Sequence, residues 1–187
     1  MLLQELSEAF GVSGHEGEVR QLILRAIENQ VDEHHTDALG NLIALKRASG
    51  RAHRKVMVAA HMDEVGLMIV HIEKEGWLRF RPVGGIDPRI LLAKRVLIGD
   101  GRVPGVIGIR PIHLLEHKAR EQVVQVQDMA IDIGTSTKEE AEQLVKLGEY
   151  AAFDTSFSEL GGGLRAVKGK AFDDRAGCAV LIELLRG

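Results

Sequence analysis

Two short stretches of reactive side chains decide the fold expected of this sequence: Ala60-His61-Met62-Asp63-Glu64 and Ala171-Phe172-Asp173-Asp174-Arg175. Largely apolar residues precede each of them, over 55–60 and 164–172, which predicts a buried strand in both places. The reactive side chains would then stand where two strands end. Ligands bind at that rim in open α/β sheets, so we expect an α/β fold with a site formed by these two stretches.

The residue types at these positions suit a metal site. His61 offers an imidazole nitrogen to zinc or cobalt, and Asp63, on the same side of an extended chain, can accept the other ring N–H. The Asp173 carboxylate has two oxygens, which is enough to bridge two cations. Cations held in this way can generate a hydroxide nucleophile and polarise a carbonyl group. A simpler interpretation stays open, in which His61 is an ordinary buried residue and Asp173 or Asp174 caps a helix over 176–185.

Further motifs accompany these stretches in a fixed order. They are Gly11-Val12-Ser13-Gly14-His15-Glu16, Asp37-Ala38-Leu39-Gly40-Asn41-Leu42, Val83-Gly84-Gly85-Ile86-Asp87, Gly105-Val106-Ile107-Gly108 and Asp132-Ile133-Gly134. With this series the chain resembles the cytosolic dinuclear-metal aminopeptidases of the glutamyl and tetrahedral (TET) aminopeptidase type, some of which carry the label endoglucanase. The resemblance implies a metallo-aminopeptidase that removes N-terminal residues from short peptides.

The resemblance also implies a role for each reactive residue. His61 would bind one of two divalent metal ions, zinc or cobalt, Asp173 would bridge both, and Asp63 would orient His61. Asp174 would support the turn after the bridging carboxylate. The family's Glu-Glu pair, which supplies the general base and a ligand, and its last Asp and His have no match after Asp173, where Glu183 is the sole glutamate. We therefore expect about the N-terminal half of the machinery, with metal bound weakly or not at all and no activity alone.

The spacing of the motifs predicts two domains. Residues 1–64 and 166–187 would form an incomplete α/β/α catalytic domain, and residues 65–165 a β-rich insert with many short strands. In the resembling family such an insert is PDZ-like or barrel-like and mediates assembly, so we expect a homo-oligomer. Helices are expected over 2–10, 16–30, 138–147 and 176–185, with capping boxes Ser13–Glu16 and Ser136–Glu139.

A competing motif lies inside the insert. His113-Leu114-Leu115-Glu116-His117 fits the H-x-x-E-H pattern of inverted zincins, in which a helix presents both histidines to zinc. A long periodic helix around it is not indicated, which favours a surface loop. The resemblance would place that loop near a neighbouring subunit, so a role for His113 and His117 in assembly or in closing an adjacent site stays open.

Composition excludes several other classes of function. A formal charge of −3 and an aromatic content of 4% argue against nucleic-acid binding. No apolar run approaches transmembrane length, and Glu5 and Glu8 stand where a signal peptide would be basic and then apolar. The single Cys178 behaves as a small core residue. These features predict a cytoplasmic protein without a membrane partner.

Two classes of function therefore stay open. The first is the metallo-aminopeptidase, present as a fragment. The second is a non-catalytic truncated paralogue or self-associating module. A glycoside hydrolase that uses Asp63-Glu64 and Asp173-Asp174 as acid pairs ranks below both, because one Trp and one Tyr are few for a sugar-binding groove.

Overall fold

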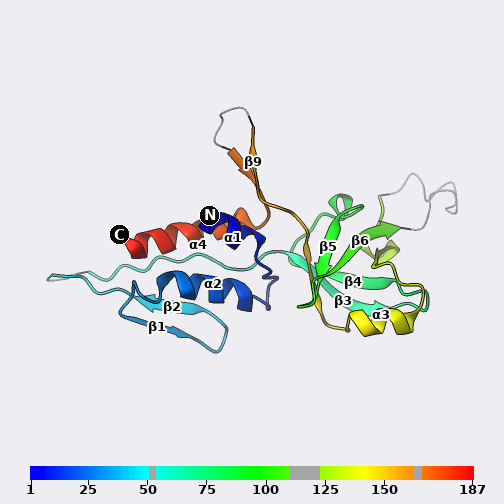
Figure 1. Cartoon of the computed structure of the whole chain (residues 1–187), viewed down its shortest axis with the longest axis horizontal. Coiled ribbons are helices and arrows are strands. Elements are labelled where there is room, and N and C mark those ends of the chain that lie inside the picture. The colour runs from blue at the N-terminus through cyan, green and yellow to red at the C-terminus, as the bar shows by residue number, and fades with distance from the viewer. Residues whose placement is uncertain (51–53, 110–122, 162–165) are drawn as a thin grey trace. The chain divides into compact units, whose positions relative to one another are not determined.

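The computed structural model describes residues 1–50, 54–109, 123–161 and 166–187, so the His113–His117 motif lies outside the described residues. The chain divides into two compact units (Figure 1). Met1–Glu64 and Ser156–Gly187 form the first, and Val65–Thr155 form the second. The range of 65–165 assigned to the insert thus extends past Thr155 into a hairpin of the first unit.

Helices from opposite ends of the chain build the first unit. Helix α4 (Phe172–Arg186) contacts both α1 (Leu2–Glu8) and α2 (Gly17–Ile27), and Figure 1 shows α1 and α4 side by side. Helix α2 is amphipathic, with apolar residues three or four apart on one face. The buried core of the unit comprises Leu6, Ala9, Val19, Ile27, Cys178 and Ile182. This packing brings the start of α4 close to the N-terminal segment.

Two small antiparallel sheets complete the described part of the first unit. Strand β1 (Glu33–Thr36) pairs with β2 (Leu42–Leu45), and β9 (Ser158–Leu160) pairs with β10 (Ala166–Lys168). The mixed α/β character expected from the sequence is confirmed. The larger sheet of an α/β/α sandwich is not seen among the described residues.

The strand predicted over 55–60 is wrong. Its residues are extended but unpaired, and Val56, Met57 and Val58 are 82, 92 and 58% exposed. A strand needs a hydrogen-bonded neighbour, and the described residues provide none there. The run before Asp173 is also shorter than predicted, because β10 ends at Lys168 and Asp173 lies in the first turn of α4.

Both predicted capping boxes differ from the structure. Helix α2 begins after Glu16 without a side-chain cap, because the Ser13 hydroxyl donates instead to Asp63. Helix α3 (Lys138–Leu144) is capped one residue later than expected, by Thr137, whose Oγ1 accepts from the backbone N–H of Glu140 at 3.2 Å.

The second unit is a closed antiparallel barrel with the strand order β3-β4-β7-β6-β5-β8. Its strands are β3 (Gly66–Ile72), β4 (Leu78–Val83), β5 (Arg95–Ile98), β6 (Val103–Ile109), β7 (Met129–Asp132) and β8 (Tyr150–Phe153), with short 3₁₀ turns at Pro88–Ile90 and Val126–Asp128. Pairing of β3 with β8 closes the barrel and leaves no open sheet edge. Alternate residues such as Leu67 and Ile69 fill its interior.

Among the described residues, the longest helices fall short of the length and apolar character that a membrane span requires.

Candidate metal centre

The two reactive stretches meet within the first unit. Nε2 of His61 lies 3.0 Å from Oδ1 of Asp173, although 112 positions separate them in the sequence. The other ring nitrogen of His61, Nδ1, lies 2.8 Å from Oδ1 of Asp63. The imidazole therefore stands between two carboxylates, and the Asp173 side chain is 96% exposed.

Backbone hydrogen bonds place Asp63 beside the N-terminal segment. The N–H of Glu64 donates to the carbonyl of Gly11 at 2.9 Å, and the N–H of Ser13 donates to the carbonyl of Glu64 at 3.2 Å. These two bonds form a parallel bridge between Val12 and Glu64. As a result the Ser13 hydroxyl faces Asp63 and donates to its Oδ2 atom.

A buried guanidinium joins the segments that carry the site. Arg175 is completely buried, and its nitrogens donate to the carbonyls of Met62, Leu6, Ala9 and Gly11. The Leu6 bond is 2.5 Å long, and those to Ala9 and Gly11 are 3.3 and 3.4 Å. Burial lowers the pKa of Arg175, an effect that the nearby carboxylate of Glu64 opposes. The charge is tolerated because its donors are matched by backbone acceptors.

The carboxylate of Glu64 completes this buried cluster. Its Oε1 atom accepts from the backbone N–H of Gly11 at 3.3 Å and from the Lys170 ammonium at 2.5 Å, and it lies 3.8 Å from Arg175. Among the described residues, every buried side-chain nitrogen and oxygen has a hydrogen-bond partner. The buried polar groups that support the candidate site are therefore all hydrogen-bonded.

The two aspartates of the second stretch do different things. Oδ1 of Asp174 accepts from the N–H of Gly177 at 3.1 Å, which is a capping contact at the start of α4. Asp173 has a non-helical backbone, is joined to Asp174 by a cis peptide bond and turns its carboxylate to His61. The capping interpretation therefore suits Asp174 and leaves Asp173 available as a ligand.

Local hydrogen bonds set the charges at the site. The hydrogen bond from the Ser13 hydroxyl has the largest effect on the pKa of Asp63 and lowers it. His61 also lowers this pKa, and burial opposes both. Burial by itself would lower the pKa of His61, but the hydrogen bonds to Asp173 and Asp63 outweigh burial and raise it. Asp63 is therefore ionised at neutral pH, and its carboxylate can accept a hydrogen bond from the N–H at Nδ1 of the ring.

The pair His61 and Asp173 fits part of a zinc centre. Ligand bonds of about 2.0 to 2.2 Å in a tetrahedron place neighbouring donor atoms about 3.3 to 3.6 Å apart, so the observed 3.0 Å needs only a small opening. A cation held here would be bound by Nε2 of His61 and by the carboxylate of Asp173. A catalytic zinc takes three protein ligands, and the described residues contain no group of three or more His, Cys, Asp or Glu arranged to hold an ion.

Sequence reasoning missed the residues that support the site. Ser13 was assigned to a helix cap, and Glu64, Lys170 and Arg175 were given no role in placing the site. Glu64 and Arg175 adjoin the reactive residues in the sequence, and this adjacency is the signal that the sequence offers for them.

The family profile of the M42 glutamyl aminopeptidases matches residues 40–187, and a profile described as AMPT matches residues 1–22. The chain belongs to the M42 glutamyl aminopeptidase family, as the motif order indicated. A putative aminopeptidase of Escherichia coli K12, FrvX, is 41% identical over 189 residues, which cover 99% of this chain and 52% of FrvX. The chain spans about half the length of the curated relatives it matches.

Solved structures agree with this assignment. A TET aminopeptidase from a marine sediment Thaumarchaeota archaeon is 39% identical with a TM-score of 0.92, over 99% of this chain and 52% of its own. A protein of Thermotoga maritima described as an endoglucanase is 46% identical, with a TM-score of 0.84 over 98 and 53% of the two chains. The Pyrococcus horikoshii TET1 peptidase is 39% identical, with a TM-score of 0.85, over 99% of this chain and 55% of its own. It is described as able to assemble into a tetrahedron or a large octahedral shell.

Proposed function

We propose that this chain supplies the first half of the active site of a dinuclear-metal aminopeptidase that removes N-terminal residues from short peptides. The observation that carries the proposal is the 3.0 Å approach of His61 Nε2 to Asp173 Oδ1 across 112 positions of sequence. Membership of the M42 glutamyl aminopeptidase family supports the same activity and a requirement for divalent metal.

Each residue has a defined task in this proposal. His61 would hold one cation through Nε2, and the exposed Asp173 carboxylate would be shared between two. Asp63 holds the Nδ1 proton of His61 and so keeps Nε2 free, while Asp174 fixes the turn that presents Asp173. Divalent cations bound here, zinc or cobalt, would supply a hydroxide nucleophile and polarise the scissile carbonyl.

The chain alone is expected to be inactive. It brings two ligand residues together, whereas a catalytic zinc takes three, and the matched motifs contain no general base. Incubation of the purified chain with an aminoacyl-anilide and zinc or cobalt should give no turnover, and metal analysis should find little bound metal. Turnover at the level of a complete relative would show that the chain already holds a full set of ligands.

Joining the chain to the remaining half of FrvX tests the proposed activity itself. The 41% identity over 99% of the chain makes the junction feasible. The joined protein should hydrolyse the anilide only with added metal, and His61→Ala or Asp173→Ala should remove that activity. A joined protein that folds, as judged by circular dichroism, but gives no metal-dependent turnover would refute the proposal.

The barrel unit is proposed to mediate homo-oligomerisation, and the protein is proposed to be cytoplasmic. The described assembly of the related TET1 peptidase supports self-association. Light scattering of the purified chain at micromolar concentration should return at least a dimer mass, and a monomer mass would overturn this part of the proposal. Cell fractionation tests the location.

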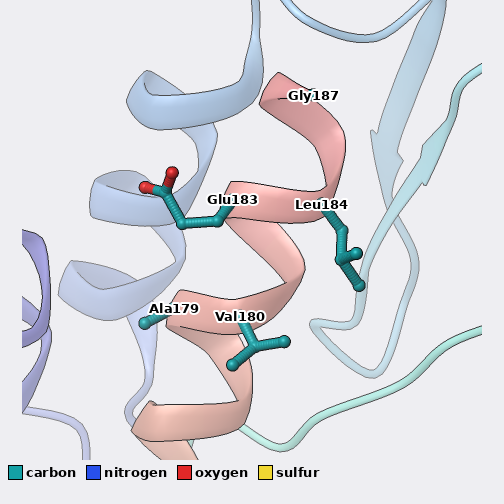
Figure 2. Close-up of a pocket in the computed structure, with 5 residues that line it drawn as sticks. All are labelled: Ala179, Val180, Glu183, Leu184 and Gly187. Carbon is teal, nitrogen blue, oxygen red and sulfur yellow. The ribbon is translucent and has the colours of Figure 1, made fainter.

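A non-catalytic, self-associating module is the second candidate. One face of α4 favours it, because Val180 and Leu184 are 59 and 60% exposed and line a hollow with Ala179, Glu183 and Gly187 (Figure 2). The described residues cover the side of α4 that carries Cys178 and Ile182, which leaves the face of Val180 and Leu184 open. If Val180→Asp and Leu184→Asp together abolish association, while the joined protein hydrolyses no anilide, this candidate is favoured.

A further inference from the structure

Both oxygens of the Asp63 carboxylate are engaged. Oδ1 faces Nδ1 of His61 at 2.8 Å, and Oδ2 accepts the hydroxyl proton of Ser13. An ionised carboxylate can only accept, so the Ser13 hydroxyl must be the donor. A single serine thus fixes the rotation of the carboxylate that holds the imidazole.

The position of Ser13 is set by the backbone around it. Its N–H donates to the carbonyl of Glu64, which follows Asp63, and the Glu64 side chain is anchored in the buried cluster by Lys170. Gly14 has a positive φ of 89° and donates its N–H to Glu16 at 2.6 Å, so the chain turns away immediately after Ser13. The hydroxyl is therefore directed at Asp63 by elements that have their own packing.

We propose that Ser13 is a positioning residue of the candidate metal centre, which orients Asp63 so that His61 keeps its proton on Nδ1 and offers Nε2 to a cation. Among the described residues, the Ser13 hydroxyl bonds to Asp63 and not to His61 or Asp173, so it acts through Asp63. Partners of metal-binding histidines fix the tautomer and the ring orientation in this way. The role in metal binding rests on the proposed function, but the effect on the tautomer does not.

The tautomer of His61 can be read directly by long-range ¹H–¹⁵N correlation spectra at alkaline pH, where the imidazole is neutral. The His61→Gln variant assigns the signal. Ser7→Ala is the matched control, because Ser7 is a buried serine of the same unit whose hydroxyl donates to the Lys170 carbonyl at 2.7 Å. Ser13→Thr keeps a hydroxyl and serves as the conservative rescue.

We expect Ser13→Ala to reduce the ratio of Nδ1–H to Nε2–H tautomer by about tenfold, which is the lower end of the range for one hydrogen bond to a charged group. Ser7→Ala should lower the melting temperature more than Ser13→Ala does and leave the ratio unchanged. Ser13→Thr should restore the wild-type ratio. An unchanged ratio in Ser13→Ala, or an equal change in Ser7→Ala, would overturn the positioning role.

The same variants separate this inference from the proposed function. In the protein joined to the second half of FrvX, Ser13→Ala should weaken the apparent zinc affinity by about 10-fold, at the lower end of the range for such partners, with Ser7→Ala unchanged. A shifted tautomer in a joined protein that shows no peptidase activity would refute the function and retain the role of Ser13. A joined protein with normal peptidase activity, in which Ser13→Ala leaves the tautomer ratio unchanged, would support the function and refute the role of Ser13.

Discussion

Arg175 donates a hydrogen bond from Nε to the carbonyl of Met62, the residue that separates His61 from Asp63. Arg175 also follows Asp173 closely, so one buried side chain ties together the backbones of both reactive stretches. Its other donors reach the carbonyls of the N-terminal segment that carries Ser13. The site is thus assembled by an arginine that takes no part in the proposed chemistry.

Arg175→Met should be strongly destabilising. It leaves buried carbonyls without a donor and removes a positive charge near Glu64, so we expect the free energy of unfolding to fall by about 3 to 5 kcal/mol. Arg186→Met is the control, because Arg186 forms an exposed pair with Glu183 and should change stability by at most about 0.5 kcal/mol. Urea unfolding measures both, and equal effects of the two variants would contradict the account.

Gly11→Ala should disturb the same cluster. A Cβ atom on Gly11 would lie 2.6 Å from Nη2 of Arg175 and 2.6 Å from Cγ2 of Val19, closer than packed atoms approach. Overpacking of this kind costs about 1 to 3 kcal/mol. Gly85→Ala meets no atom within 4 Å and should be nearly neutral. Thermal unfolding that places both variants at the wild-type midpoint would be inconsistent with a tightly packed Arg175.

Asp173 and Asp174 should respond differently to truncation. Asp174→Ala loses the hydrogen bond to the N–H of Gly177 and should cost about 1 kcal/mol. Asp173→Ala removes a 96% exposed carboxylate and should change the stability little. Chemical unfolding of the two variants separates a helix cap from a candidate ligand. The opposite order would assign the cap to Asp173 and weaken its proposed role.

Cys178 should be protected from thiol reagents while the chain is folded. Burial raises the pKa of its thiol to about 11, from an ordinary value of 9.0. The folded state therefore favours the neutral thiol, and this contribution to stability is complete below pH 9.0 and is lost as the pH rises through about 11. Reaction with Ellman's reagent at neutral pH should be slow until urea unfolds the chain. A fast reaction of the folded chain would show that the α4 interface opens.

Patterns that repeat along the chain were predicted well from the sequence. The many short strands expected in the insert are present in the barrel, as in β3 and β6, because apolar residues alternate or cluster there between turn residues and such local signals survive folding. The approach of His61 to Asp173 was also predicted, because each stands in a motif whose family order is specific. The apolar run over 55–60 gave the same signal as a strand, but pairing depends on a neighbour that the local pattern does not encode.

The supporting residues could not be predicted in the same way. Ser13 and Glu16 match the spacing of a capping box, and only the tertiary position of Asp63 redirects the Ser13 hydroxyl. The acceptors of Arg175 are backbone carbonyls, which any residue type supplies. A hydrogen-bond network of this kind therefore leaves no side-chain pattern in the sequence.

A cobalt titration followed by NMR tests the central claim most directly. Paramagnetic Co²⁺ perturbs nearby signals even when it binds weakly, so the incomplete ligand set does not prevent the measurement. The His61 ring and the amides around Asp63 and Asp173 should respond first, and Asp173→Asn should abolish the response, while the exposed His34 and His35 are little affected. An unperturbed His61 at millimolar Co²⁺, or an unchanged response in Asp173→Asn, would contradict the assignment of this pair as metal ligands.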